Sequence, residues 1–428
     1  MTSHVTIIGS GIAAVAAAIA ASSSGAKVTV IGGRAGATAL YSGAWDIAAD
    51  PTRYPGKPWE EMTPPQTSLQ ELGRRGPTHP YNLISRNEKV PDLATFLNQA
   101  IRQVERELAY RLHGSLEKNF LIPSPLGTVK ATAFVGPTHD GNILEMRGAR
   151  LLIIGIRELP FPSRLMGTLL KEQITRQPTP FCSDIKIREI SMKRLSGGTG
   201  LMELALKLDE EGLSDRLHES LLEEAEKFRA THILLPPVIG VRRTQHIFSK
   251  LKETKNVVWF ESLGIPPSIP GLRLHHHIEA YLKNGGVNFI EGEGVRAAAK
   301  NRRVVSLTCE KGSGITEEIP VDRLILATGK FIGGGLSGPP LKESLLNLPL
   351  LPPSPSLEPH FFGNHKLFAT GLRVGPLLQP VDSSGRLAYE NLWAAGSIIG
   401  GYQPITEGCG MGVALGTGTL SGRLATDA

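Results

Sequence analysis

The run Val5-Thr-Ile-Ile-Gly-Ser-Gly-Ile-Ala-Ala14 decides the fold of this chain. Its first four residues are apolar or β-branched, which favours a strand, and the Ala-rich stretch 15–21 favours a helix packed on a sheet. Ser22-Ser-Ser-Gly25 ends that helix, with Gly25 as its C-terminal cap, and 27–31 is a second apolar strand. Strand, Gly-x-Gly-x-x-Ala, helix and strand form the pattern of a dinucleotide-binding βαβ unit.

Each small residue of this turn has a physical reason to be small. We expect Gly9 to make the tight turn and Gly11, which has no Cβ, to let a pyrophosphate approach the backbone. Ala13 lies in the same turn, and Ala14 is small enough for the helix to sit close to the strand. Free N–H groups at the helix start attract phosphate, so the turn predicts a nucleotide site. The alternative is a glycine turn in a purely structural α/β unit.

The end of the second strand departs from the usual pattern. An acidic residue normally binds the ribose hydroxyls there, but this chain has Gly32-Gly33-Arg34. The ribose contact is therefore missing or made from elsewhere, and Arg34 could meet a phosphate instead. A truncated ligand without the adenylate half stays open.

Glycine-rich segments recur after this unit. Ser42 and Gly43 lie in the small-residue run 40–46, which suits backbone lying against a flat cofactor ring, although a surface loop is the alternative. The strand 323–327 ends in Ala-Thr328-Gly329, which would again bring backbone close to a nucleotide.

The third glycine-rich strand end lies near the C-terminus. Gly396 and Ser397 follow a strand, and a last helix then starts within 406–412, which includes Cys409, Gly410, Met411 and Gly412. Such a helix start stabilises negative charge on a reduced flavin ring. Together the three turns predict an α/β, Rossmann-like FAD/NAD(P)-binding flavoprotein domain that is split in sequence. We assign it residues 1–50 and 270–428, with 51–269 as an inserted cap, partner or substrate domain whose first part, to residue 80, is Pro- and Gly-rich loop.

Size, charge and cysteine usage exclude other classes. The chain has 428 residues, a net charge of +6 and no stretch of eighteen apolar residues, so no membrane span is expected. Cys182, Cys309 and Cys409 form no CxxC pair, which argues against zinc or an iron–sulfur cluster and fits a reducing cytoplasm. The histidines 275–277 would diverge around a helix, so we expect no metal site there either. Arg273, near the same helix start, is a candidate for an anion or for the flavin ring.

Several motifs make the chain resemble a known family, the B subunits of the anaerobic glycerol-3-phosphate dehydrogenases. This family is related in fold to the flavoprotein subunits of succinate dehydrogenase and fumarate reductase. The matching stretches are Tyr41–Asp46, His79–Leu83, Pro125–Thr128, Pro266–Arg273, Ala395–Pro404 and Gly408–Gly412. The last two are the most specific, and residues 129–230 match only loosely.

The resemblance implies a heterotrimer that oxidises glycerol 3-phosphate, a small phosphorylated substrate. In such a heterotrimer one member is an FAD-containing dehydrogenase, the member that this chain resembles holds a flavin usually assigned as FMN, and an iron–sulfur, membrane-associated member passes electrons to quinone. It places the chain in the cytoplasm, peripheral at the inner face of the cell membrane. FMN agrees with the missing ribose-binding acid, so we prefer it to FAD. We expect a noncovalent flavin, because related proteins attach theirs through a histidine and 32–50 contains none.

Two features limit this interpretation. Succinate dehydrogenase-type flavoproteins generally have an acid where this chain has Ser397, and no catalytic residue carries over. A non-catalytic flavin protein that only relays electrons is therefore an alternative. A flavin-dependent nucleic-acid-modifying enzyme is another, motivated by Arg74-Arg75, Arg242-Arg243 and Arg302-Arg303. These pairs are scattered without interleaved aromatic residues, so we expect no nucleic-acid partner.

Overall fold

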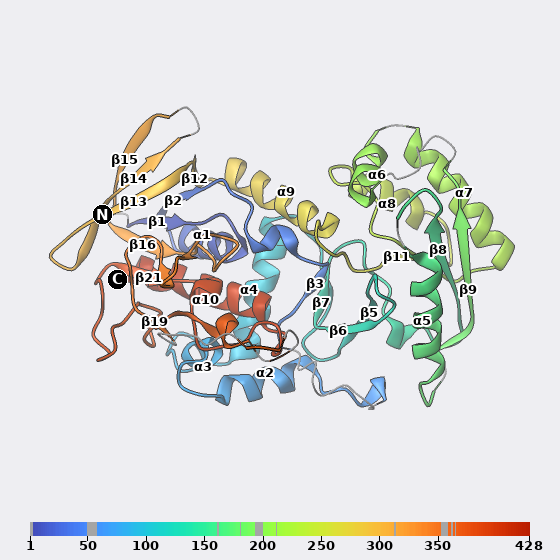
Figure 1. The fold of residues 1–428 in the computed structure, drawn as a ribbon, viewed down its shortest axis with the longest axis horizontal. Helices are drawn as coiled ribbons and strands as arrows, with labels where there is room; N and C mark the ends of the chain where they lie inside the picture. The colour runs from blue at the N-terminus through green and yellow to red at the C-terminus, as the bar shows by residue number, and fades with distance from the viewer. Residues whose placement is uncertain are drawn as a thin grey trace.

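A parallel five-stranded sheet forms the centre of the first lobe in the computed structural model (Figure 1). The structure describes residues 3–48, 58–160, 162–179, 181–192, 200–210, 212–311, 314–351, 358–360, 363 and 365–428. The strand order is β12-β2-β1-β16-β21. The strands are β1 (His4–Ile8), β2 (Lys27–Gly32), β12 (Asn288–Glu291), β16 (Arg323–Leu326) and β21 (Leu392–Ala394). This sheet confirms the predicted Rossmann-like fold class, with its strands drawn from both ends of the chain.

Two helices of small residues pack against each other on this sheet. They are α1 (Ile12–Ser23) and α10 (Gly410–Asp427), which lie at opposite ends of the sequence. A Cβ on Gly418 would lie 2.4 Å from the carbonyl oxygen of Ala13, and one on Gly422 would lie 2.4 Å from that of Ala17. The glycines of α10 therefore let the two helix backbones approach closely.

Three further helices pack onto this pair, two of them directly and one through the other two. They are α2 (Pro65–Arg74), α3 (Pro80–Ser85) and α4 (Leu93–Glu107), and their apolar residues join the core of the first lobe. Helix α4 buries Leu93, Phe96, Leu97, Ile101 and Val104 on one face. Helix α2 contradicts the loop predicted through residue 80, because Pro65 stands in the first turn of a helix, where proline is tolerated. Residues 51–57 lie outside the described residues.

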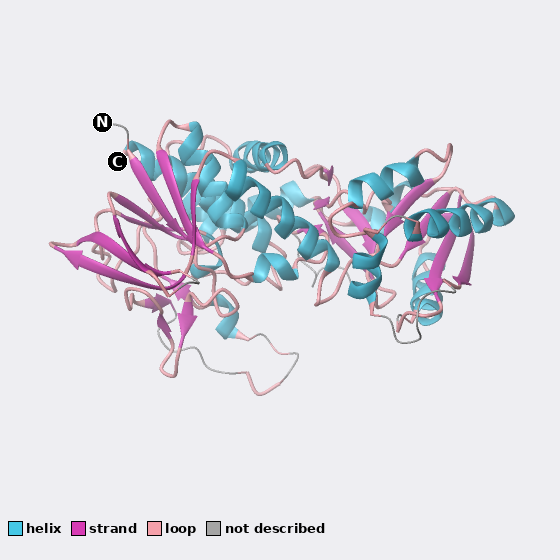
Figure 2. Cartoon of the chain, turned by 90° about the horizontal axis from the view of Figure 1, so that it is seen from above, coloured by secondary structure: helices cyan, strands magenta, loops and turns pink. Residues whose placement is uncertain are grey.

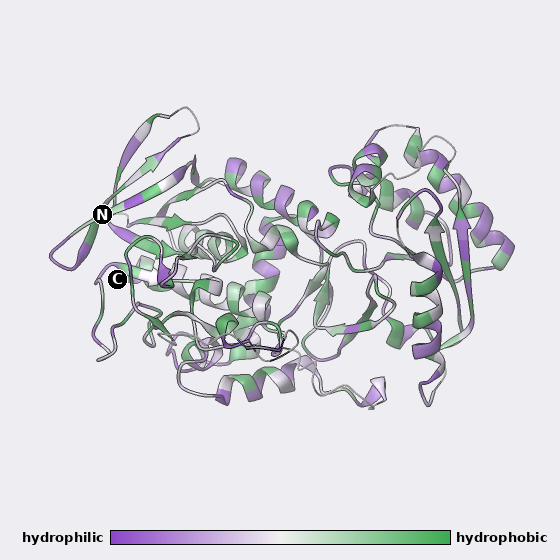
Figure 3. Ribbon diagram, in the orientation of Figure 1, coloured by the Kyte–Doolittle hydropathy of each residue, from purple (hydrophilic) through white to green (hydrophobic). Residues whose placement is uncertain are grey.

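The second lobe is built on its own parallel sheet, in the order β11-β10-β8-β9. Its elements are β8 (Ala149–Ile156), α5 (Ser163–Thr175), β9 (Cys182–Ile190), α6 (Leu201–Leu208), α7 (Leu213–Phe228), β10 (His232–Leu235), α8 (Thr244–Lys252) and β11 (Val258–Glu261). A separate set of buried apolar residues fills this lobe. Figure 2 shows the two lobes side by side from a second direction. In Figure 3 polar residues lie along α2 and α7, whereas apolar residues run along β8.

Smaller sheets and one helix complete the chain. Helix α9 (Ile269–Asn284) leads from the second lobe back to the first. An antiparallel sheet follows, made of β13 (Glu293–Lys300), β14 (Arg303–Glu310) and β15 (Thr316–Pro320). The remaining short elements are η1 (Ala37–Leu40), β3 (Ala44–Trp45), η3 (Trp59–Glu61), β4 (His113–Gly114), β5 (Phe120–Pro123), β6 (Val129–Thr132), β7 (Phe134–Val135), η4 (Ile143–Glu145), β17 (Leu336–Ser337), β18 (Lys342–Glu343), β19 (Leu350–Leu351), η5 (Lys366–Ala369), β20 (Gly371–Leu372) and η6 (Gly396–Ile398). Among the described residues, no helix is both long and apolar enough to span a membrane.

Candidate functional site: a cavity at three strand ends

The three glycine-rich turns meet at one edge of the first sheet. Ile8 on β1 pairs with Ile31 on β2 and with Leu326 on β16, so the turns after β1 and β16 lie next to each other. Gly9 has a φ of +120°, and a Cβ there would lie 2.2 Å from the carbonyl oxygen of Ala327. The tight turn therefore requires glycine at this position. The turn after β21 joins them, since the N–H of Ala395 donates to the carbonyl of Leu326 at 2.8 Å.

A cavity of about 810 Å³ opens at this edge. Its walls come from the strand ends, the segment 36–46, residues 292–295 at the start of β13, the loop 327–334 and the start of α10. Ten of the residues predicted to bind cofactor line it: Gly9, Gly11, Ala13, Arg34, Ser42, Thr328, Gly329, Ser397, Gly410 and Met411. A Cβ on Gly11 would meet only the Thr38 hydroxyl, at 3.1 Å. The remaining space beside Gly11 belongs to the cavity, which is what an approaching phosphate needs.

Five other predicted residues do not line the cavity. Ala14 of α1 is fully buried in the core of the first lobe. Gly396 faces Ala13, Gly43 faces the ring of His139, and Gly412 faces the hydroxyl of Tyr81, as the positions of an added Cβ show. Cys409 is buried, with its sulfur 3.6 Å from Oε2 of Glu407. These five positions lie next to cavity residues in the sequence, but their side-chain directions point toward protein rather than toward the cavity.

Arg34 lies at the end of the cavity nearest β2 and pairs with Glu293 at the start of β13. Nε of Arg34 donates to Oε1 of Glu293 at 2.7 Å, and both residues line the cavity. The hydrogen bond and charge of Arg34 lower the pKa of Glu293. An acidic side chain thus lies beside the end of β2, but it comes from a different strand.

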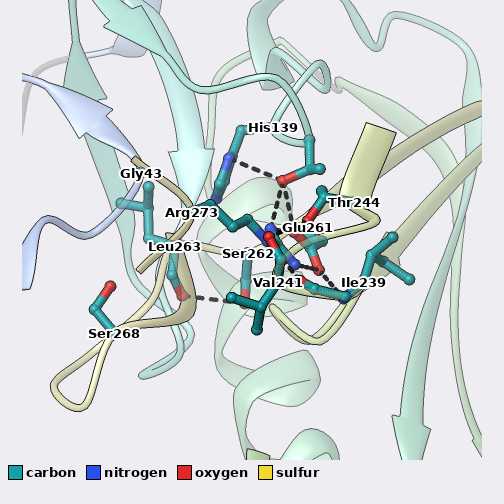
Figure 4. A network of polar contacts seen from close by, with 12 residues as sticks. Gly43, His139, Ile239, Val241, Thr244, Glu261, Ser262, Leu263, Ser268 and Arg273 are labelled. Atoms are coloured by element: carbon teal, nitrogen blue, oxygen red, sulfur yellow. Dashed lines mark hydrogen bonds and ion pairs between the residues drawn. The ribbon is translucent and has the colours of Figure 1, made fainter. Parts of the chain in front are cut away.

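Arg273, the sequence candidate for an anion or for the flavin ring, does not line the cavity. Figure 4 shows its guanidinium enclosed by protein, where it pairs with Glu261 at the end of β11. It also donates to Oγ1 of Thr138 at 3.0 Å and to the carbonyl of Gly240 at 2.8 Å. Burial raises the pKa of Glu261, but the charge and hydrogen bond of Arg273 outweigh this effect, and the net pKa is lowered. The pair therefore ties α9 to the second lobe.

The segment around α9 also holds one wall of the cavity. The hydroxyl of Ser268 donates to the carbonyl of Tyr41, and the N–H of Gly264 donates to the carbonyl of Ser42 at 2.7 Å. A Cβ on Gly271 would lie 2.0 Å from the carbonyl oxygen of Ala39 in η1. The wall that carries Ser42 is thus held by residues more than 200 positions away in sequence.

A polar cluster fixes the loop that precedes α10. Nδ1 of His79 accepts from the N–H of Tyr81 at 3.1 Å, which assigns the ring proton to Nε2 as donor to Glu407 at 3.2 Å. Glu407 also accepts from the N–H of Gln403 at 3.0 Å and pairs with Arg75 at 3.3 Å. Burial raises the pKa of Glu407, but these donors lower it overall.

This cluster brings a histidine, a carboxylate and a thiol together. The ligand atoms of His79, Glu407 and Cys409 all lie within 4.8 Å of one another. Each hydrogen-bonds within the cluster, so Glu407 serves as an ionised anchor for the loop. That loop supplies Tyr402 and Pro404 to the cavity wall. His79 lies in one of the stretches that carry the family resemblance. Its hydrogen bond to Glu407 therefore links that stretch to the loop that lines the cavity.

Several charged or polar residues of the cavity were missed as site residues by sequence reasoning, among them Asp46, Glu293, Lys330 and Tyr402. Asp46 accepts from Nζ of Lys130 at 2.6 Å and from Oγ1 of Thr132 at 3.0 Å. Lys330 and Tyr402 line the cavity near Phe368. Lys330 directly follows the Ala-Thr-Gly motif and Tyr402 directly follows Gly400-Gly401, so proximity to a motif was the available signal.

Comparisons with known proteins agree with a flavin site. A family model described as FAD binding domain matches residues 4–413. The chain is 25% identical to the B subunit of the probable anaerobic glycerol-3-phosphate dehydrogenase of Halobacterium salinarum, covering 100% of this chain and 98% of the relative. It is 26% identical to the B subunit of the anaerobic glycerol-3-phosphate dehydrogenase of Actinobacillus pleuropneumoniae, covering 97% of each. A solved structure of the quinol fumarate reductase of E. coli is 10% identical, covers 100% of this chain and 70% of that one, and has a TM-score of 0.38, too low to carry an argument.

Proposed function

The chain belongs to the FAD binding domain family, and from that premise we propose that it is a flavoprotein subunit of an anaerobic glycerol-3-phosphate dehydrogenase. The reaction oxidises the secondary alcohol of glycerol 3-phosphate to the ketone of dihydroxyacetone phosphate, releasing two electrons and two protons. The observation that carries the proposal is the nearly end-to-end similarity to two relatives that bear this name. The cavity supports the proposal, because residues 4–413, which match the FAD binding domain model, contain all three glycine-rich turns that line the cavity.

The residues of the cavity fit a bound flavin. The Gly9–Gly11 turn and the N-terminus of α1 would hold the phosphates, since the first-turn amides of a helix have no intrahelical acceptor. The start of α10 at Gly410 and Met411 would face the ring with a partial positive charge. When bound, the flavin supplies the two-electron acceptor that the oxidation needs.

We favour FAD over the FMN that sequence reasoning preferred. The cavity lining includes both the start of α10 and the Arg34–Glu293 pair beyond the phosphate turn. FMN ends at its single phosphate, whereas FAD continues into an adenosine half that would occupy the region beside this pair. Glu293 would accept from ribose hydroxyls in place of the missing acid of β2. Acid extraction and mass measurement of the cofactor should give FAD, and Glu293→Ala should weaken FAD binding while leaving FMN binding unchanged.

Electrons that reach this flavin need an outlet supplied by partners. The free cysteines Cys182, Cys309 and Cys409 stand on β9, on β14 and before α10, too dispersed to hold one iron–sulfur cluster together. We therefore place the chain in a complex with two partners, an FAD-containing dehydrogenase and an iron–sulfur, membrane-associated protein that delivers electrons to quinone. In this arrangement the chain is cytoplasmic and peripheral at the inner face of the membrane.

We propose that the two lobes have different roles in the flavoprotein. We retain 1–50 and 270–428 as the flavin-binding unit and 51–269 as the insertion. The second lobe, with its own sheet and core, supports a role for that insertion in contacting a partner or substrate. Helices α3 and α4 of the insertion pack on α10, and α2 packs on α3 and α4, so this part of the insertion lies in the flavin lobe.

Anaerobic reduction of the flavin-loaded chain tests the function. Glycerol 3-phosphate should bleach the flavin absorbance of the chain alone, but quinone reduction should appear only after both partners are added. A flavin that is reduced only when a dehydrogenase partner is present would identify a non-catalytic electron relay instead. Full quinone turnover by the isolated chain would contradict its assignment to a multi-protein complex.

A further inference from the structure

The start of α9 contacts the second lobe through one buried arginine. Arg273, the fifth residue of α9, is 4% exposed, and its guanidinium pairs with the fully buried Glu261 at the end of β11. It also donates to the carbonyl of Gly240, in the loop after β10, at 2.8 Å. A buried ion pair holds its partners firmly, because separating them leaves an uncompensated charge away from water. Arg273 therefore fixes the start of α9 to the second lobe (Figure 4).

The same helix start contacts the cavity wall through a buried serine. Ser268 is 2% exposed, and its hydroxyl accepts from the N–H of Gly271 at 3.0 Å as the N-cap of α9. The same hydroxyl donates to the carbonyl of Tyr41. Shortly before it in the chain, the N–H of Gly264 donates to the carbonyl of Ser42 at 2.7 Å. Tyr41 and Ser42 line the cavity, so two successive carbonyls of its wall are bonded to the segment that begins α9.

These two sets of contacts lie within one rigid unit. The carbonyl of Ser268 accepts from the N–H of Leu272 at 3.0 Å, the hydrogen bond that closes the first turn of α9. A Cβ on Gly271 would lie 2.0 Å from the carbonyl oxygen of Ala39 in η1, so no gap separates this turn from the wall. A shift of Arg273 therefore also shifts Ser268 and its contact with the wall.

We propose that the start of α9 couples the position of the second lobe to the flavin cavity, with Ser268 and Arg273 as positioning residues. Neither residue lines the cavity, so both act on the flavin through Tyr41 and Ser42. The inference rests on the proposed function for the presence of a flavin and of partners. A partner that displaces the second lobe on binding would change the affinity for flavin, and by linkage the flavin would change the affinity for that partner by the same factor.

Titration with FAD of the full chain freed of flavin tests the role of Ser268. Ser268→Ala should weaken FAD binding by about two- to ten-fold, the range for one neutral hydrogen bond. Ser268→Thr keeps the hydroxyl and should bind FAD more tightly than Ser268→Ala. Ser262→Ala is the matched control, because Ser262 is also buried and lies shortly before Ser268, but its hydroxyl donates to the carbonyl of Leu263 at 3.3 Å.

The bound flavin supplies a second readout that a loss of stability alone would not move. At saturating FAD, the visible absorbance and circular dichroism of the flavin should differ between Ser268→Ala and Ser262→Ala, because the wall beside the flavin has shifted. Urea unfolding of the two variants shows how much stability the lost cap costs.

A double-mutant cycle tests the coupling itself. Glu261→Gln weakens the hold on Arg273 and should also weaken FAD binding, although Glu261 lies outside the cavity. If this effect passes through Ser268, it should be at least about two-fold smaller in the Ser268→Ala background. Thr138→Val, which removes a hydroxyl that accepts from Arg273 at 3.0 Å, is the milder variant to use if Glu261→Gln does not fold.

Three results would overturn the proposal. They are equal FAD affinity and equal flavin spectra for Ser268→Ala and Ser262→Ala, tighter FAD binding by Ser268→Ala than by Ser268→Thr, and additive effects in the cycle. All of these measurements use FAD and no substrate. If the coupling is found but glycerol 3-phosphate never reduces the flavin, the coupling stands and the proposed dehydrogenase function fails.

Discussion

Replacing Gly418 with alanine probes the contact between α1 and α10 on which the cavity depends. The new Cβ would lie 2.4 Å from the carbonyl oxygen of Ala13 and 2.9 Å from Cβ of Ala16. Both atoms belong to α1, and a helix backbone cannot rotate away as a side chain can. The two helices must therefore separate, and Ala13, which lines the cavity, moves with α1.

The expected magnitude follows from two opposing effects. Alanine is favoured over glycine inside a helix by about 1 kcal/mol. Overpacking a well-packed contact costs about 1–3 kcal/mol, so Gly418→Ala should lose up to about 2 kcal/mol of unfolding free energy. Gly416 is the matched control on the same helix, because its Cβ would meet only the side-chain ends of Leu97 and Ile84, at 2.8 and 2.9 Å. Those ends can rotate, so Gly416→Ala should be close to neutral.

The assay compares the two variants in flavin-loaded protein. Urea unfolding would be followed by circular dichroism and by the fluorescence of released flavin. Gly418→Ala should unfold at lower urea and release flavin earlier than Gly416→Ala, which should follow the unmodified chain. Equal midpoints and equal flavin retention for the two variants would refute the claim that close approach of α1 and α10 shapes the cavity.

Three other predictions use single features. Gly11→Val should abolish flavin binding while circular dichroism shows a retained fold, because Gly11 is extended at φ −86° and its Cβ points into the cavity; Gly9→Ala should instead impair folding. A glycine turn by itself would suggest that valine strains the backbone at this position, but the extended φ and ψ of Gly11 accommodate valine without strain. Glu261→Gln should lower the unfolding free energy at pH 7 by about 3–5 kcal/mol. Because the folded pKa of Glu261 is lowered, its stabilisation is present above the unfolded pKa of about 4.3 and lost as pH falls, so urea midpoints of the two proteins should converge below pH 4. Acid precipitation should release all flavin, since the described cavity lining contains no histidine or cysteine, and colour retained on the pellet would contradict this.

Local sequence chemistry was enough to predict the turns of the site. The run 5–14 combines a β-branched strand, two glycines and an alanine-rich helix, and these preferences need no distant contact to take effect. The same holds for the strand ends at 327–329 and 395–397, which the structure brings together at the cavity. The fold class followed from these turns because parallel strands place their carboxyl ends at one edge of a sheet.

The positions of the other candidate residues depended on partners remote in sequence or on the direction of a side chain, which local patterns do not encode. Arg273 was a plausible flavin contact until Glu261 and Thr138 enclosed it, and neither is marked by a motif. Cys409 and Gly412 lie in the predicted segment, but the rotation of α10 turns them toward protein. Lys330 was missed because a lysine after a glycine turn normally indicates a solvated surface, and only tertiary packing buries it.

The packing of α1 under α10 also sets an order of events during synthesis. Helix α1 ends at Ser23 and its covering helix begins at Gly410. At about 5–20 residues per second, the ribosome needs on the order of 20–80 s to make the chain between them. Throughout that interval the face of α1 that α10 covers has no native partner, although β2 and α4 can already pack on the rest of the helix. Because the start of α10 lines the cavity, the flavin can bind only after the chain is nearly complete. A shortage of flavin would therefore leave completed chains without cofactor and would not affect nascent ones.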